Sequence, residues 1–459
     1  MALNPAYLRK VPHFDTAFGR GYGEEVDWCQ KTRALGGVHL CQHGLFVEHR
    51  GGSSFGSAEK ATLISDHNRM ISGRYPDYDR DVQRFIASDP IRTARLSLGL
   101  AWVGIAGVPV PVILAHSMGG GAGMVLKRRL ERICATGGAA VVLRVGGARR
   151  WRIELHTALG QTLGETDTFD LVETLLAPID RRALVYSCGV GDPDPVALPE
   201  ALLSLYRPGR DTLEVAFHDY FPISPSYCLL DGDAVYRGLP SGNTADPVHI
   251  AHRPDGRPVP LSDWQTSWGR LIAEADRIEV FSGASKALVA GVWPDYTDRI
   301  VISPHRCGAH PERLAPRPDG AIGVLGNIGL QKGAAVVSAL SRRAAGHGRR
   351  VVVIGAMDPG FPVGDGTIVH GTYDPDEIGA LARRYGIGAW IIPSIWPEAF
   401  SFTTREALAT GLPVIGFDLG AQAEALNAAS NGIVLDPTGP EDAAGRILAV
   451  LDGRRARAA

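Results

Sequence analysis

The sequence predicts an α/β fold made of two doubly wound parallel sheets, and three observations lead to this prediction. Residues 321–451 alternate between apolar, strand-like runs and helical patterns. Two apolar strands, at residues 111–115 and 321–325, each run into a glycine-rich turn that is followed by a helical pattern. The chain of 459 residues, 45% of them apolar, is long enough for about three domains with ordinary cores.

The alternation is clearest in the C-terminal part of the chain. Strands are predicted at residues 351–355, 367–371 and 389–392, with a helix at residues 374–385 between the last two. Ligands of doubly wound sheets bind at the carboxyl ends of the strands. A binding site is therefore expected on the loops that follow these strands.

The glycine-rich turn at residues 326–333 has the composition of a phosphate cradle. Glycines such as Gly329 and Gly333 let backbone N–H groups approach an anion, and the helix predicted at residues 334–343 adds partial positive charge at its start. Lys332 adds a full positive charge. An ordinary strand, turn and helix with a solvated lysine would have the same sequence pattern, and this interpretation stays open.

Two carboxylates, Glu398 and Glu406, are separated by seven residues and follow the predicted strand at residues 389–392. Glu398 is expected in a loop. Glu406 is expected in the first turn of a helix that Thr403 or Thr404 would cap. The spacing of Thr403 and Glu406 also fits a capping box, which would give Glu406 a structural role instead.

The stretch from residue 393 to residue 424 resembles the E-x7-E signature of glycosyltransferase family 4, retaining enzymes with the GT-B fold of two Rossmann-like domains facing a cleft. The resemblance implies that Glu398 contacts the donor sugar and that Glu406 contacts the ribose hydroxyls of a nucleotide sugar. By the same resemblance, the donor site includes Ala399, Phe400 and Ser401.

The turn at residues 326–333 is similar to the diphosphate-binding loop of that family, where an Arg and a Lys usually flank the turn. Lys332 is present, whereas Asn327 stands where the Arg is usual. Both positions, with Gly329 and Gly333, are predicted to bind the donor. The departure at Asn327 leaves open an alternative, in which the chain is a degenerate transferase that binds a nucleotide sugar, or only a partner enzyme, and performs no chemistry.

The first glycine-rich loop is predicted to reach across the cleft toward the diphosphate and the acceptor, as the resemblance implies. Its candidate residues are Gly119, Gly120 and Gly121. His218 stands at a predicted strand end before a proline-broken loop, and this segment resembles the cleft histidine of the family. A lone histidine is often structural. His218, Glu398 and Lys332 are nevertheless predicted as the catalytic residues.

The same loop allows an alternative from another class of enzyme. Residues 115–119, Ala-His-Ser-Met-Gly, look like the nucleophile elbow of an α/β-hydrolase with Ser117 as the nucleophile. The local order of strand, tight turn and helix fits this interpretation. A hydrolase would leave the two carboxylates Glu398 and Glu406 unexplained, so it ranks below the transferase.

Residues 14–55 resemble the C-terminal part of a family 2 glycosyltransferase of GT-A fold. In that family an acidic group at a helix start supplies the general base, and a later histidine can hold a divalent metal. The resemblance implies a base at Glu25, beside Glu24 and Asp27, and a metal ligand at His49. About half of such a domain would lie before residue 1, so an inactive remnant of a longer tandem protein is expected.

The domain plan that follows has four parts. Residues 1–75 are the remnant, 76–109 a linker, 110–312 the acceptor-side domain, and 313–459 the donor domain with a return helix that packs across the hinge. The predicted activity is retaining transfer of a hexose or deoxyhexose from a nucleoside-diphosphate sugar to a bacterial surface polysaccharide or a lipid-linked glycan. No cofactor is expected, and no metal for the GT-B site.

Composition limits the partners and the compartment. A net charge of −2 gives no basic field for nucleic acid, and the six cysteines show no C-x-x-C spacing, as in a reduced cytoplasmic protein. Residues 96–115 carry no charge but contain several Gly and Pro residues, which favours a linker and a first strand over a membrane span. Peripheral contact with the membrane or with other polysaccharide-assembly enzymes is compatible with the predicted acceptors.

Overall fold

The computed structural model describes residues 2–19, 21–40, 57–308 and 310–458, with the side chains of residues 57–60 and 454–458 excepted. The chain forms two compact units, Met1–Gly99 and Leu100–Ala459. The second unit contains both large sheets and all of the strands that the described residues form.

All regular elements that the described residues of the first unit form are helices. Its elements are α1 (Pro5–Lys10), η1 (Thr16–Phe18), α2 (Glu24–Ala34), α3 (Ser57–Arg74), α4 (Tyr78–Ser88) and the start of α5 (Arg92–Ile105). The predicted acidic helix start is present, because α2 begins at Glu24. The resemblance to a GT-A remnant stays a prediction.

The stretch predicted as a linker, residues 76–109, carries two helices instead. The helix α5 forms there because Leu96 and Leu100, one turn apart, are fully buried on one of its faces. Gly104 lies inside α5 at a close approach, since a Cβ atom there would lie 2.2 Å from the carbonyl oxygen of Pro178. The glycines that suggested a loop are therefore compatible with a packed helix.

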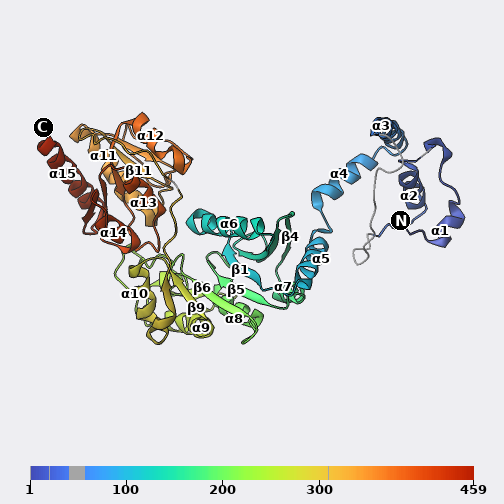
Figure 1. The fold of residues 1–459 in the computed structure, drawn as a ribbon, viewed down its shortest axis with the longest axis horizontal. Coiled ribbons are helices and arrows are strands. Elements are labelled where there is room, and N and C mark those ends of the chain that lie inside the picture. The colour runs from blue at the N-terminus through green and yellow to red at the C-terminus, as the bar shows by residue number, and fades with distance from the viewer. Residues whose placement is uncertain (1, 20, 41–56, 309, 459) are drawn as a thin grey trace. The chain divides into compact units, whose positions relative to one another are not determined.

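The first sheet of the second unit has eight strands in the order β10-β9-β6-β5-β1-β2-β3-β4 (Figure 1). The strands are β1 (Val110–His116), β2 (Ala139–Val145), β3 (Trp151–Thr157), β4 (Gly160–Thr166), β5 (Arg182–Tyr186), β6 (Thr212–Ala216), β9 (Arg277–Val280) and β10 (Ile300–Ile302). Pairing is parallel except at β3 and β4, an antiparallel extension that the sequence analysis missed. The helices are α6 (Gly120–Ala135), α7 (Phe169–Leu176), α8 (Leu198–Leu205), α9 (Leu261–Glu274) and α10 (Gly283–Val292).

The second sheet is parallel throughout, in the order β13-β12-β11-β14-β15-β16. Its strands are β11 (Ala321–Leu325), β12 (Val351–Ile354), β13 (Ile368–Val369), β14 (Ile387–Ile392), β15 (Val414–Phe417) and β16 (Gly432–Leu435). The helices are α11 (Ala334–Ala344), α12 (Ile378–Tyr385), α13 (Phe402–Ala409), α14 (Gly420–Asn427) and α15 (Pro440–Ala458). Hydrophobic clusters fill both faces of this sheet, so the predicted doubly wound α/β class is confirmed.

The C-terminal helix α15 differs from its prediction. Its buried residues Ala444, Ile447 and Leu448 belong to the same hydrophobic cluster as α11. The backbone carbonyl of Glu441 also accepts a hydrogen bond from the guanidinium of Arg343, at the end of α11. The helix therefore packs within its own domain, whereas the sequence predicted packing across the hinge.

A different contact joins the two domains of the second unit. The carboxylate of Glu424, on α14, accepts hydrogen bonds from the backbone N–H groups of Gly283 and Ala284. These two groups open α10, so an acidic residue of one domain satisfies the helix start of the other.

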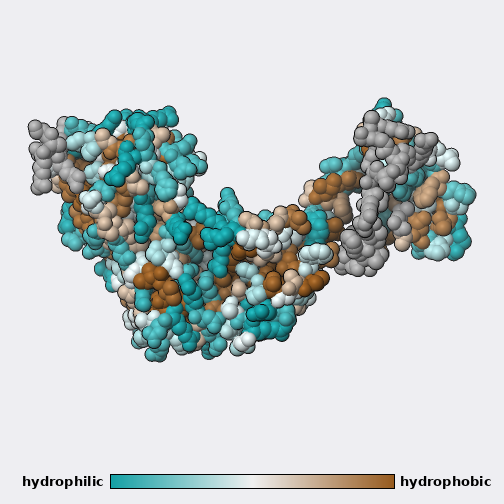
Figure 2. All heavy atoms as spheres, viewed as in Figure 1, coloured by the Kyte–Doolittle hydropathy of each residue, from teal (hydrophilic) through white to brown (hydrophobic). Residues whose placement is uncertain are grey.

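The surface of the second unit includes exposed apolar residues at the end of α5. Trp102, Ile105 and Val108 are 76%, 82% and 58% exposed, and Figure 2 shows brown, hydrophobic spheres around this helix. The candidate membrane span at residues 96–115 is divided between α5 and β1. Within the described residues, no helix combines the length and the apolar character needed to cross a bilayer.

Candidate functional site

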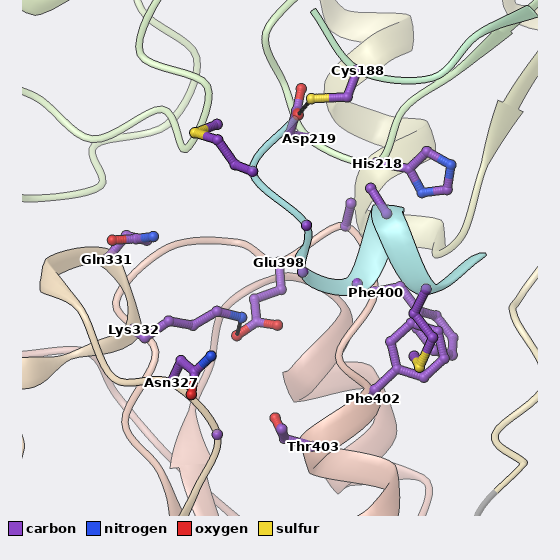
Figure 3. Close-up of a pocket in the computed structure, with 18 of the residues that line it drawn as sticks. Cys188, His218, Asp219, Asn327, Gln331, Lys332, Glu398, Phe400, Phe402 and Thr403 are labelled. Atoms are coloured by element: carbon purple, nitrogen blue, oxygen red, sulfur yellow. Dashed lines mark hydrogen bonds and ion pairs between the residues drawn. The ribbon is translucent and has the colours of Figure 1, made fainter. Parts of the chain in front are cut away.

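A cavity of ≈ 580 Å³ lies between the two sheets of the second unit, where parallel strands of both end (Figure 3). The domain of the eight-stranded sheet contributes residues that follow β1, β5 and β6, and the domain of the six-stranded sheet contributes residues that follow β11 and β14. Ten predicted site residues line it: Gly119, Gly120, Gly121, His218, Asn327, Lys332, Glu398, Ala399, Phe400 and Glu406. The structure thus brings together segments that are far apart in the sequence.

The first glycine loop presents a helix start to this cavity. Gly119 and Gly120 have φ angles of 79° and 75°, a conformation that favours glycine, and α6 begins at Gly120. The first N–H groups of a helix have no partner within the helix. Those of α6 are therefore available to an anion in the cavity.

The second glycine turn is shaped by its packing against the end of β14. Gly333 has a φ of 79°, and a Cβ atom there would lie 1.9 Å from the carbonyl oxygen of Pro393. Only glycine can occupy this position without moving the strand end. Gly329 and Gly333 do not line the cavity themselves, and neither does the buried Ser401. They shape the loops that carry Lys332 and Glu398.

Lys332 and Glu398 form an ion pair. The Lys332 Nζ atom lies 2.8 Å from Oε1 of Glu398, whose side chain is only 3% exposed (Figure 3). Lys332 is the only Lys or Arg among the described residues that line the cavity. These two residues were predicted to contact different parts of a donor, and the structure places them against each other as an ion pair.

The loop that carries Glu398 is held in place by Gln422, a fully buried residue of α14. The Gln422 side-chain oxygen accepts the backbone N–H of Glu398 at 3.1 Å, and its side-chain nitrogen donates to the carbonyl of Trp396 at 2.8 Å. The backbone carbonyl of Glu398 accepts a third hydrogen bond, from the N–H of Ala421. These contacts fix the backbone of Glu398 without using its carboxylate.

Glu406 lies farther along α13 than predicted. The helix begins at Phe402 with Ser401 in the capping position, so the predicted caps at Thr403 and Thr404 are wrong, as is the capping box. Thr404 instead donates a hydrogen bond from its hydroxyl to that of Ser401. Glu406 therefore sits in the second turn and lines the cavity, where burial raises its pKa to about 6.

Asn327 uses its side chain for a local contact. Its Oδ1 atom accepts the backbone N–H of Ala356 at 3.3 Å, which ties the turn after β11 to the end of β12. Asn327 also lines the cavity next to Lys332. The residue that replaces the usual Arg therefore has a structural partner and no positive charge.

His218 lies in a stack of rings at the cavity wall. Its ring centre is 4.6 Å from that of Phe281 and 5.3 Å from that of His305. Burial is the main cause that lowers the pKa of His218 to about 3 and the pKa of His305 to about 4. Both imidazoles are therefore neutral at physiological pH, and each can donate one hydrogen bond and accept another.

Several lining residues were not predicted as site residues. They are His116, Cys188, Asp219, Tyr227, His305, Gln331, Tyr373 and Trp396. Asp219 directly follows His218 at the end of β6, and Cys188 follows β5, so their place at strand ends was a usable signal. Tyr227 and Gln331 meet across the two domains through a 3.3 Å hydrogen bond, which no local pattern indicates.

The hydrolase alternative finds no support at Ser117. Its hydroxyl donates a 2.9 Å hydrogen bond to the backbone carbonyl of Val145. A nucleophilic serine instead donates to the imidazole that removes its proton. The contact to Val145 is that of a structural serine in a loop.

The three acidic residues predicted at the start of α2 differ in how far they are buried. Asp27 is buried, and its Oδ1 accepts hydrogen bonds from Arg74 and Tyr75, both at 2.8 Å. Burial opposes its ionisation, but the hydrogen bonds from Lys31, Tyr75 and Arg74 outweigh it and lower the pKa of Asp27. Glu24 is half-buried and Glu25 is exposed. The predicted ligand His49 lies outside the described residues.

The described residues contain no group of three or more His, Cys, Asp or Glu side chains placed to hold a metal ion.

Comparison with known proteins identifies the C-terminal domain. Residues 318–459 match the family model described as "Glycosyl transferases group 1". No curated protein matches the chain in sequence. The structure is similar to that of sucrose-phosphate synthase from Thermosynechococcus elongatus, with a TM-score of 0.50 at 15% identity, covering 75% of this chain and 91% of that one.

Two further solved structures are similar at lower scores. HepE from Anabaena, in complex with UDP, has a TM-score of 0.47 at 13% identity, covering 76% of this chain and 91% of that one. The catalytic domain of starch synthase IV from Arabidopsis thaliana, bound to ADP and acarbose, has a TM-score of 0.46 at 13% identity, with coverages of 76% and 94%. The family model supports the predicted glycosyltransferase domain at residues 318–459, and the similarity to the synthase confirms the predicted two-domain fold.

Proposed function

We propose that the protein is a retaining enzyme of glycosyltransferase family 4. The premise is that residues 318–459 are a group 1 glycosyltransferase domain in a chain of GT-B fold. It would transfer a hexose or deoxyhexose from a nucleoside-diphosphate sugar to a glycan acceptor. The acceptor would be a bacterial surface polysaccharide or a lipid-linked glycan. The enzyme would work in the cytoplasm, with peripheral contact to the membrane or to other polysaccharide-assembly enzymes, and without a metal.

One observation carries the proposal. A single cavity is lined by the helix start at Gly120, the cation Lys332 and the two carboxylates Glu398 and Glu406. A nucleotide sugar needs partners of these types, because its diphosphate is anionic and its ribose and sugar carry hydroxyl groups. The arrangement spans both domains, as expected for a donor that is held between them.

The chemistry would be mainly electrostatic. As the bond between sugar and diphosphate breaks, negative charge builds up on the leaving phosphate, and Lys332 with the N–H groups of Gly120 and Gly121 would stabilise it. Glu398 would orient the sugar and support the positive charge that develops on its ring. Neutral His218 would hydrogen-bond a sugar hydroxyl. The resemblance to family 4 implies that the diphosphate itself helps to deprotonate the acceptor, so no protein nucleophile is required.

A degenerate, non-catalytic protein is the second candidate, and Asn327 is the observation that favours it. Its side chain contacts Ala356 and brings no charge, so Lys332 would face the diphosphate without the usual Arg. The two candidates differ in donor hydrolysis. A transferase is expected to release free sugar slowly from its donor when no acceptor is present, whereas a pure binding protein releases none.

We expect one nucleotide series to stabilise the protein against heat. Thermal unfolding would be measured with UDP, GDP and dTDP and with their common sugar conjugates. Ligand at 100 times its dissociation constant should add about 2.7 kcal/mol to the free energy of unfolding. A shift restricted to one series, together with hydrolysis of that donor, supports the transferase. A shift without hydrolysis supports the degenerate candidate, and a folded protein that responds to no nucleotide contradicts both.

Affinity for the nucleotide sugar should fall as the pH drops below about 6. Burial raises the pKa of Glu406 above the usual 4.5 to about 6, so its carboxylate is ionised at pH 7 and mostly protonated at pH 5. A protonated carboxyl is a poorer acceptor for two ribose hydroxyls. We expect a loss of up to about tenfold in affinity between these pH values.

Isothermal titration with the intact nucleotide sugar would measure this dependence. A free nucleoside diphosphate is unsuitable, because its terminal phosphate titrates near pH 6 as well. The control is Glu406→Gln, which should bind more weakly at pH 7 and lose the pH dependence. An unchanged pH profile in Glu406→Gln would show that another group titrates.

A further inference from the structure

Asp219 lies on the cavity wall, and the proposed donor chemistry assigns no role to its carboxylate. It follows His218 at the end of β6, in the acceptor-side domain, and it is 8% exposed. Figure 3 shows it beside Cys188, across the cavity from Glu398 and Lys332. Its position is therefore on the side of the cavity opposite the residues proposed to hold the donor.

The carboxylate of Asp219 has few partners. Its Oδ1 atom accepts the backbone N–H of Phe221 and its Oδ2 atom accepts the thiol of Cys188, both at 2.9 Å. A thiol is a weak donor, and a carboxylate offers about four acceptor positions. Burial raises the pKa of Asp219 to about 6, because these two hydrogen bonds only partly offset the loss of water. The protein thus maintains a poorly compensated carboxylate at the cavity wall.

The arginines whose charges act on His116 and His218 on this side of the cavity are already paired, Arg144 with Glu154 and Arg129 with Glu214. The described lining residues of the acceptor-side domain include Asp219 and no Lys or Arg, and Lys332 on the opposite side is paired with Glu398. A phosphate or carboxylate group on an acceptor would meet a buried negative charge here without a compensating cation. A hydroxyl group would instead supply the donor that Asp219 lacks.

We propose that Asp219 binds a hydroxyl of the acceptor, and that the acceptor group entering this side of the cavity is an uncharged sugar. The inference rests on the proposed transferase activity. Asp219 is then a specificity-determining residue, which holds the acceptor so that a neighbouring hydroxyl faces the donor sugar. Tyr227 also lines this side, and its ring is suited to pack on the apolar face of a sugar.

The first test uses the unaltered protein and the nucleotide sugar identified by thermal unfolding. Release of nucleotide would be followed with octyl glycosides of glucose, galactose, mannose and N-acetylglucosamine, and in parallel with glucose 6-phosphate and mannose 6-phosphate. We expect at least one neutral glycoside to accelerate release above hydrolysis, and neither sugar phosphate to do so. Acceleration by a sugar phosphate, or by none of the neutral glycosides, would overturn the inference while donor hydrolysis still supported the transferase.

The second test is Asp219→Asn, which keeps the shape of the side chain and an oxygen for the N–H of Phe221. We expect the KM for the neutral glycoside to rise about tenfold or more, whereas the donor affinity measured by titration changes less than about twofold. Asp233→Asn, which removes an 83% exposed carboxylate of the same domain, is the matched control and should change neither value. An unaltered acceptor KM in Asp219→Asn, or an equal loss of donor affinity, would contradict the assignment.

Discussion

Lys332→Ala is expected to lower kcat by about 10²–10³-fold, which corresponds to about 3–4 kcal/mol in the activation barrier. Lys332 is the only Lys or Arg among the described residues lining the cavity, and Asn327 supplies no second charge. The loss should therefore not be compensated by a neighbour. Steady-state transfer or donor hydrolysis would measure kcat, and titration with the nucleoside diphosphate should show weaker binding as well.

The effect of Lys332→Ala on kcat must be distinguished from its effect on stability, because Lys332 also neutralises Glu398. Without the lysine, a carboxylate that is 3% exposed lacks its cation, and we expect a loss on the order of 1–3 kcal/mol in the free energy of unfolding. The double variant Lys332→Ala/Glu398→Gln removes the buried charge and should recover most of that stability without recovering activity. Because Glu398→Gln by itself is expected to lower transfer, the decisive measurement is binding of the nucleoside diphosphate: recovery of that binding in the double variant would mean that Lys332 acts only through the fold.

A matched control is available on the surface of the acceptor-side domain. Lys127 lies on α6 with a side chain that is 78% exposed, and it forms an ion pair with Glu131 at 3.9 Å. Lys127→Ala should leave kcat, donor affinity and stability close to those of the unaltered protein. Activity of Lys332→Ala equal to that of Lys127→Ala would contradict the role of Lys332 on the diphosphate.

Much of the fold could be predicted from the sequence, because its signals are local. The strands β11, β12 and β14 are continuous apolar runs bounded by glycine or proline, and each was placed within a few residues. The glycine turns at α6 and α11 were found for the same reason. The hairpin of β3 and β4 was missed, although Trp151, Ile153 and Leu155 alternate with polar residues.

The arrangement inside the cavity could be predicted only in part. The residue types at strand ends indicated where Lys332, Glu398 and Glu406 would gather. The pairing of Lys332 with Glu398 depends on how two loops pack, and the support by Gln422 depends on a helix 24 positions away along the chain. Such contacts form only when the loops and helices have packed around the sheet, so no local sequence pattern predicts them. The capping error at α13 arose because Ser401, Thr403 and Thr404 are all residue types that favour a helix start, and only the structure shows that Ser401 takes the capping position.

Glu398→Gln should abolish most of the transfer while leaving nucleotide binding intact. The amide has nearly the same shape, and the loop is held through the backbone of Glu398 by Gln422 and Ala421, so its position should not change. The lost negative charge no longer stabilises the developing positive charge on the sugar. We expect single-turnover transfer to fall about 10²-fold or more.

Binding of the nucleoside diphosphate is the measurement that distinguishes this effect from a damaged site. In the unaltered protein, a bound diphosphate would compete with Glu398 for Lys332, because the two side chains are paired at 2.8 Å. Glu398→Gln weakens that competition, so affinity for the diphosphate should be equal or higher. Glu441→Gln, a 66% exposed carboxylate of the same domain, is the matched control. Lower affinity in Glu398→Gln would show that Glu398 itself holds the nucleotide, and full activity would remove it from the chemistry.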